Sequence, residues 1–179
     1  MKKNVTSVVI SIIIIITWIL NTDFLDFSSD TVENREAVEL VRVIDGDTIV
    51  YQKNDQNYTL RLLLVDTPES STTKTGEAQP FGLEAKEYLK DILADETLHI
   101  EYEPVQEKTD KYGRELAYLF AGDIFVQKLL LEEGYARLAY ESGEEKYFEI
   151  LQKSETQANE DDKNIWGIKN YVEEYGFRP

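Results

Sequence analysis

Three short stretches of the sequence concentrate carboxylates and cations beside predicted strands: IDGDT at 44–48, RLLLVDTPE at 61–69 and TDKYGR at 109–114. Alone, none identifies a site, because Asp-Gly pairs and basic turns are common on protein surfaces. In the second stretch, four consecutive aliphatic residues indicate a buried strand with charges at both ends. A buried charge is costly unless a partner, a hydrogen bond or a metal compensates it. These charges therefore either lie at solvent-exposed strand ends or meet compensating groups.

Oxygen ligands for a metal ion are available in the first two stretches. The carboxylates of Asp47 and Asp66, with a backbone carbonyl near Thr67, would suit Ca²⁺, which takes oxygen ligands and leaves positions for water and substrate. The chain has no cysteine and one histidine. This composition excludes cysteine zinc sites, thiol nucleophiles and multi-histidine metal sites. His99 lies in the alternating stretch TLHIEYE and is interpreted as an ordinary strand residue.

The remaining charged residues would suit a phosphodiester. Arg61 and Arg114 could grip the phosphate and stabilise charge that develops in the transition state. Glu69 could orient or deprotonate an attacking water, and Pro68 before it would end the strand and restrain the backbone. Metal, guanidinium pair and base together predict phosphodiester hydrolysis.

Hydrophobic periodicity predicts the elements that must position these residues. Alternating and aliphatic runs indicate five strands, at 37–43, 48–53, 58–65, 97–103 and 114–121. Amphipathic patterns indicate three helices, at 81–94, 123–134 and 144–163. The third strand and the first helix are joined by a long loop at 66–80, and loops of this length are usually functional or mobile. This order favours a mixed β and α fold, a small closed barrel of the oligonucleotide/oligosaccharide-binding (OB) kind.

Single positions refine this picture. Gly46 is expected to adopt a positive φ in the IDGD turn. Asp123 and Gly134 are expected to cap the second helix at its two ends. The inner side of the third helix is expected to use three residues: Tyr147, Leu151 and Ala158.

The third strand poses a geometric problem. Arg61 and Asp66 are five positions apart, so strict alternation places them on opposite faces of a straight strand. Both can face one site only if the strand bends, bulges or ends before Asp66.

The N-terminal region is typical of an exported protein. Lys2 and Lys3 precede an uncharged, mostly apolar stretch at 5–22, which lies between the lengths of a signal-peptide core and a transmembrane helix. No small-residue cleavage site follows, so a hydrophobic helical anchor is favoured over a cleaved signal, with the chain beyond it outside. The expected organisation is an anchor or signal at 1–22, an acidic linker at 23–36, one domain at 37–167 and a tail at 168–179.

The chain is strongly acidic, with a formal net charge of −16. Residues 37–167 hold 28 acidic and 14 basic side chains, a balance of −14. Proteins that only coat nucleic acids use Lys and Arg to neutralise phosphates. The acidity therefore argues against a passive coat, but it is compatible with an enzyme whose cations gather in one cleft.

Four successive motifs, VRVIDGDTI, RLLLVDTPE, TDKYGRELAYLF and SETQANEDDKNIWG, resemble those of the staphylococcal (micrococcal) nuclease family. The resemblance runs in order from about Ala37 to Gly167. It implies a five-stranded OB barrel with three helices. It also implies Ca²⁺-dependent hydrolysis of DNA and RNA to 3′-phosphates, with single-stranded or denatured substrates favoured and a monomeric protein expected.

The resemblance also implies roles for individual positions. By motif position, the catalytic residues are Arg61, Glu69 and Arg114; the calcium ligands are Asp47, Asp66 and the Thr67 carbonyl; the residues that hold the nucleotide are Lys111, Tyr112 and Tyr140. The chain departs from the family's best-known member at Ser142, where that member has a second tyrosine, and in its acidity. Both departures predict a weaker grip on nucleic acid.

Two other functions fit the same fold. The first is an OB barrel that binds single strands without cutting them. The second is a surface interaction module for another anionic or carbohydrate ligand, with calcium as a structural ion. Cutting of denatured DNA only in the presence of Ca²⁺ would favour the enzyme over both.

Overall fold

The computed structural model describes residues 34–71, 77–104 and 106–178. The apolar stretch at 5–22, where a hydrophobic helix is expected, lies outside these residues, as does most of the acidic linker. Within the described ranges, no helix has the length and apolar character needed to cross a membrane.

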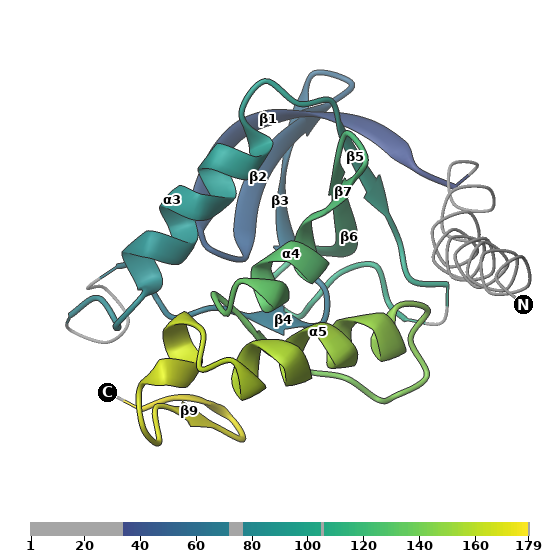
Figure 1. The fold of residues 1–179 in the computed structure, drawn as a ribbon. Helices are drawn as coiled ribbons and strands as arrows, with labels where there is room; N and C mark the ends of the chain where they lie inside the picture. Colours follow the sequence, from purple (N-terminus) through teal and green to yellow (C-terminus); the bar gives the residue numbers. More distant parts are fainter. Residues whose placement is uncertain (1–33, 72–76, 105, 179) are drawn as a thin grey trace, which may run out of the picture. The chain divides into compact units, whose positions relative to one another are not determined.

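Five strands close into a barrel, as predicted (Figure 1). Antiparallel pairing runs in the order β3-β2-β1-β5-β6, and a parallel pairing of β3 with β6, through Leu60 and Glu115, closes the ring. The five strands are β1 (Glu36–Asp45), β2 (Thr48–Lys53), β3 (Gln56–Leu62), β5 (Leu98–Glu101) and β6 (Glu115–Ala121). Short pairs lie outside the ring: β4 (Val65–Asp66) with β8 (Arg137–Leu138), β7 (Ile124–Phe125) with β6, and β9 (Val172–Glu173) with β10 (Gly176–Phe177).

Apolar side chains from four of these strands form the core. Ile49, Leu60, Ile100 and Leu119 are fully buried. Burying one such side chain is worth about 1.5–3 kcal/mol. The barrel is therefore a rigid platform for the loops at its ends. His99 is a half-buried residue of β5, as expected.

The three predicted helices are present as α3 (Gly82–Leu93), α4 (Val126–Glu132) and α5 (Phe148–Glu160). The predicted inner residues of the third helix, Tyr147, Leu151 and Ala158, are buried. A 3₁₀ turn, η1 (Asn164–Gly167), follows α5.

Of the two caps predicted for α4, one is correct. Gly134 follows the helix with a φ of +67°, as a C-terminal glycine should. Asp123 does not begin the helix. It lies in the tight turn between β6 and β7, and α4 starts at Val126. The sequence pattern placed this start too early because the two-residue strand β7 is as apolar as the helix that follows.

The predicted third strand at 58–65 is wrong beyond Leu62. The chain turns at Leu63 and Leu64, and Leu64 has a φ of +63° before β4 begins. The turn is buried and its polar groups are paired, because the Leu63 N–H donates to the Ala117 carbonyl (3.1 Å) and the Ala139 N–H donates to the Leu64 carbonyl (3.0 Å). This break, rather than a bulge, brings Arg61 and Asp66 to the same side.

Gly46 is required for a different reason from the one expected. It is not among the described residues with positive φ. A Cβ added to Gly46 would instead lie 2.8 Å from the Thr67 Oγ1 and 2.9 Å from the Ala85 Cβ. The glycine therefore allows the β1–β2 turn to approach Thr67 and α3 closely.

The C-terminal segment is ordered as a hairpin of β9 and β10. Tyr171 donates from its hydroxyl to the Pro80 carbonyl (2.7 Å), and its ring packs 5.3 Å from the Phe177 ring. The hairpin is thereby fastened to the end of the loop that precedes α3.

Candidate functional site

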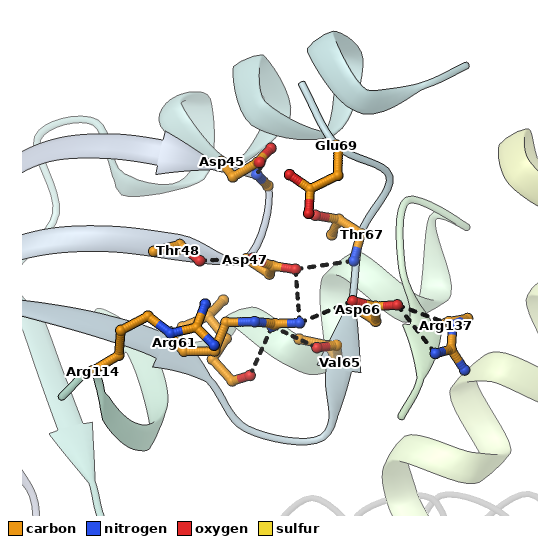
Figure 2. A network of polar contacts seen from close by, with 12 residues as sticks. Asp45, Asp47, Thr48, Arg61, Val65, Asp66, Thr67, Glu69, Arg114 and Arg137 are labelled. Atoms are coloured by element: carbon orange, nitrogen blue, oxygen red, sulfur yellow. Dashed lines mark hydrogen bonds and ion pairs between the residues drawn. The ribbon is translucent and has the colours of Figure 1, made fainter. Parts of the chain in front are cut away.

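A buried arginine lies at the centre of the predicted site (Figure 2). The Arg61 Nη2 is 3.0 Å from the Asp47 Oδ2 and 3.0 Å from the Asp66 Oδ1. The Arg61 Nη1 donates to the Val65 carbonyl (2.6 Å) and more weakly to the Leu62 carbonyl (3.2 Å). One guanidinium therefore compensates two carboxylates and closes the turn after β3.

Asp47 is held in place by its neighbours in the fold. The Thr48 hydroxyl donates to the Asp47 Oδ1 (2.8 Å), and the Thr67 backbone N–H donates to the Asp47 Oδ2 (3.1 Å). The β1–β2 turn and the segment after β4 are thus joined through this carboxylate. Asp47, Asp66 and Thr67, the predicted metal ligands, are brought together.

Asp66 has a second partner that the sequence did not reveal. Arg137 of β8 donates to the Asp66 Oδ2 from Nε (3.1 Å), and its Nη2 is also 3.1 Å away. Burial raises the pKa of Asp66 and the charge of Asp47 adds to this effect, whereas Arg61 and Arg137 oppose it. Two cations therefore lie beside this carboxylate.

The oxygen atoms in this region suit a hard cation. Asp47 and Asp66 supply carboxylates, and the buried Thr67 Oγ1 has no hydrogen-bond partner among the described residues. Across residues 34–71, 77–104 and 106–178, no three Asp, Glu, His or Cys side chains are grouped so that they could hold a metal ion. A cation here would bind two carboxylates and complete its shell with a peptide carbonyl, water or substrate, which is compatible with Ca²⁺.

Glu69 is held by its backbone. Its N–H donates to the Gln79 Oε1 (2.8 Å), and the Gln79 N–H donates to the Glu69 carbonyl (2.9 Å). The next residue, Ser70, donates its N–H to the Asp45 Oδ1 (3.1 Å). These bonds tie Glu69 to the end of the loop before α3 and Ser70 to β1, and the Glu69 carboxylate extends toward Thr67 (Figure 2).

Arg114 lies directly before β6, the strand that pairs with β3. The β3–β6 pairing places Arg61 opposite Leu116, two residues beyond Arg114. The Arg114 Nε donates to the Asp110 Oδ2 (2.7 Å), while the Asp110 Oδ1 accepts the N–H groups of Tyr112 and Arg114 (2.9 Å each). Burial alone would raise the pKa of Asp110, but these hydrogen bonds outweigh it and lower the pKa.

Two tyrosines project into solvent beside these arginines. Tyr112 and Tyr140 are 72% and 75% exposed. The Arg114 guanidinium lies 5.7 Å from the Tyr112 ring, and the Arg61 guanidinium lies 5.8 Å from the Tyr140 ring. Lys111 is also exposed, with its ammonium 5.1 Å from the Tyr112 ring.

Eight of the nine predicted residues thus form two groups beside the β3–β6 pairing of the barrel, and the ninth, Glu69, lies in the segment that follows Thr67. Arg61, Asp47, Asp66 and Thr67 are in direct contact, with Tyr140 beside them; the second group is Arg114, Lys111 and Tyr112. Sequence reasoning missed the residues that hold these groups: Asp110, Arg137 and Gln79. Asp110 had a usable signal, since an aspartate before a turn often accepts N–H groups from that turn.

The chain is similar in sequence to known proteins of one family. The model of the family described as staphylococcal nuclease homologue matches residues 59–168. The thermonuclease of Staphylococcus hyicus is 36% identical over 170 residues, which cover 93% of this chain and 99% of that protein. The thermonuclease of Staphylococcus intermedius is 36% identical over 169 residues, with the same coverage of both chains.

A relative from another genus is similar over a shorter range. Endonuclease YncB of Bacillus subtilis (strain 168) is 39% identical over 141 residues, covering 78% of this chain and 66% of that protein. The family match spans both arginines and the loop at 66–80. With its closed five-stranded barrel and these matches, the chain belongs to the staphylococcal nuclease family.

Proposed function

We propose that this protein is a Ca²⁺-dependent nuclease that hydrolyses phosphodiester bonds of DNA and RNA and leaves 3′-phosphates. The observation that carries the proposal is the Arg61 cluster. A buried guanidinium is fixed between two carboxylates, and a second guanidinium, that of Arg114, enters from the paired strand. The thermonucleases and the endonuclease to which the chain is similar support nuclease activity.

The two arginines would act on the phosphate. Arg61 is preorganised by its bonds to Asp47, Asp66 and Val65, so little reorganisation is needed when charge develops on the phosphate oxygens. Arg114 is 31% exposed at its side chain and is held by Asp110 through Nε, which leaves its terminal nitrogens available to a phosphate. It would stabilise the departing 5′ oxygen.

Glu69 would position or deprotonate the attacking water. Water adds to phosphorus, the bond from phosphorus to the 5′ oxygen breaks, and the proton passes to that oxygen. The Gln79 and Asp45 contacts hold the segment that carries Glu69. The products would be a 3′-phosphate and a 5′-hydroxyl.

Calcium would be held by Asp47, Asp66 and the Thr67 carbonyl, and when bound it would polarise a phosphate oxygen and help to place the water. Lys111, Tyr112 and Tyr140 would hold the phosphate and sugar of the substrate. All three are exposed beside the two guanidiniums.

We also propose that the nuclease acts outside the cytoplasm, on the basis of the two lysines and the apolar stretch at 5–22. Protease added to intact cells should digest the domain if residues 5–22 anchor it, whereas the culture medium should contain the domain if they are cleaved. Retention of the protein in the cytoplasm would contradict this proposal.

Degradation of heat-denatured DNA by the full-length protein tests the reaction. The substrate should be cut with Ca²⁺ and remain intact with a chelator, and a Glu69→Gln variant should be nearly inactive with Ca²⁺. Binding without cutting would instead support a non-catalytic OB module. End-labelling of the products should find 3′-phosphates; 5′-phosphates would contradict the proposed direction of cleavage.

A further inference from the structure

A pocket of about 300 Å³ lies beside the Arg61 cluster. It is a small cavity by the standards of ligand sites, which range over about 300–1,000 Å³. Its walls come from the segment that follows β8 and from the C-terminal hairpin. The lining residues are Arg137, Ala139, Tyr140, Glu141, Glu174 and Tyr175.

The hairpin contributes an aromatic ring that is largely exposed to solvent. Tyr175 occupies the tight turn between β9 and β10 and is 89% exposed. Neither Glu174 nor Tyr175 has a positive φ, so this turn does not require Gly, Asn or Asp and can carry a large side chain at its tip. A tyrosine at this tip contributes little to folding and is available to a ligand.

The opposite wall contributes a second exposed ring. Tyr140 is 75% exposed and has a φ of +61°, an uncommon conformation for a bulky residue. Strained residues of this kind persist where the surrounding structure holds them and are frequent at ligand sites. The ring also lies 5.8 Å from the Arg61 guanidinium, which ties this wall to the candidate site.

Arg137 connects the two walls to the site. Its Nη1 donates to the Glu174 carbonyl in the hairpin turn (3.2 Å), and its guanidinium lies 6.0 Å from the Phe177 ring. Its Nε and Nη2 contact Asp66. The hairpin tip, and with it Tyr175, is therefore anchored to the same carboxylate that Arg61 contacts.

We propose that this pocket is a nucleobase subsite, in which a base of the bound strand stacks against Tyr140 and Tyr175. This inference rests on the proposed nuclease function. Bases have π-faces that stack on aromatic side chains regardless of sequence. Glu141 and Glu174 add negative charge to the pocket, which disfavours a phosphate there and favours an uncharged base.

Binding of a short labelled single-stranded oligonucleotide to the full-length protein tests the subsite. A chelator keeps the strand intact, and fluorescence anisotropy gives the Kd. The Tyr175→Ala variant should bind about 5- to 10-fold more weakly, at the low end of stacking effects because the ring is exposed. Tyr175→Phe and Tyr175→Trp keep an aromatic face and should bind as well as the unaltered protein.

Two controls separate stacking from general effects. Leu83→Ala removes another exposed apolar side chain, on α3, and should leave the Kd unchanged. A set of oligonucleotides, each lacking the base at a different position, is then compared. For one of these abasic oligonucleotides, Tyr175→Ala and the unaltered protein should have the same Kd. That position is the one whose base occupies the pocket.

The failure of this inference differs from the failure of the proposed function. Suppose that the unaltered protein cuts DNA and that Tyr175→Ala has the same Kd as the unaltered protein for every oligonucleotide. The proposed subsite is then wrong, and the proposed nuclease function is unaffected. If the unaltered protein does not cut DNA yet Tyr175→Ala loses base-dependent affinity, the subsite stands and the hydrolytic function is wrong. Equal weakening on intact and all abasic strands would also overturn the subsite.

Discussion

Arg61 and Arg114 carry the same charge but are held in opposite ways. Arg61 is 7% exposed and contacts two carboxylates and two carbonyls. Arg114 is partly exposed and has one carboxylate partner, Asp110, four residues before it. The first arginine is part of the fold as well as of the site, whereas the second can be removed with little effect on the fold.

Truncation of the two arginines should therefore separate stability from activity. Arg61→Ala removes the cation that contacts the buried Asp47 and leaves Asp66 with Arg137 alone, so it should lower the free energy of unfolding by about 3–5 kcal/mol. Arg114→Ala should lower it by at most about 1 kcal/mol but reduce kcat by about 100-fold or more. Urea denaturation and nuclease assays measure the two effects. Arg42→Ala, at an exposed position of β1, is the control; an active Arg114→Ala would refute the role of Arg114.

Glu155 of α5 should make stability depend on pH. Its carboxylate accepts the Leu138 N–H (2.6 Å), but burial raises its pKa above the ordinary value of 4.5, helped by Glu141 and opposed by Arg137. A raised pKa in the folded state favours folding below that value, and this contribution is lost as the pH rises through the folded pKa. Glu155→Gln should therefore be more stable than the unaltered protein at pH 7.

The stability difference should disappear in acid, where both side chains are neutral. Thermal unfolding at pH 7 and below pH 4.5 measures it. Glu149→Gln, at an exposed position of the same helix, should change stability by no more than about 0.5 kcal/mol at either pH. If Glu155→Gln were less stable than the unaltered protein at pH 7, the ionised Glu155 carboxylate would stabilise the folded state, and this prediction would be wrong.

Among the secondary-structure elements, the barrel strands could be predicted from the sequence, but the turn that brings the site residues together could not. β2 has the predicted bounds because turn-forming residues flank it on both sides. The turn at Leu63 and Leu64 consists of aliphatic residues, so no local signal distinguishes it from a strand. Contacts from distant residues, Ala117 and Ala139, satisfy its backbone. The charged residues of the site could be identified from the sequence. The residues that hold them in place could not, because tertiary contacts bring them there.

The loop before α3 and the C-terminal hairpin are linked through one glutamine. Gln79 exchanges hydrogen bonds with the Glu69 backbone and approaches the Phe177 carbonyl with its Nε2 (3.5 Å). Tyr171 reaches Pro80 beside it. Hairpin, loop and Glu69 therefore share one set of contacts.

Removal of the Gln79 side chain should loosen Glu69 without unfolding the barrel. Gln79→Ala leaves the Glu69 N–H without its acceptor, so kcat should fall by about 10-fold because the base is less well positioned. Hydrogen exchange at Glu69 should speed up, while exchange in β2 stays slow. Gln52→Ala, which alters a contact to Asn57 across the β2–β3 pair, is the control. Unchanged exchange at Glu69 would contradict a positioning role.

The whole molecule is acidic, although its proposed substrate is a polyanion. At low salt the long-range field repels DNA, and added salt screens this repulsion. We therefore expect kcat/KM on denatured DNA to stay level or rise between about 10 and 150 mM NaCl. A steep fall, as expected of an enzyme that relies on a basic surface, would contradict this.

Charge reversal far from the site tests the same effect. Asp91→Lys with Glu160→Lys changes two exposed helix positions. The double variant should have a higher kcat/KM than the unaltered protein at low salt, and the two should converge at high salt. A constant ratio at all salt concentrations would show that the repulsion is not long-range.

The parallel seam between β3 and β6 has a consequence for the order of folding. It joins Leu60 to Glu115, residues far apart in the chain, whereas β1, β2 and β3 pair through short turns. Because loop-closure entropy opposes distant pairings, we expect the β1–β3 meander to form early and the seam late. Arg61 and Arg114 lie on opposite sides of that seam. The two arginines should meet only when the barrel closes, so a partly folded chain would not yet be able to cut nucleic acid.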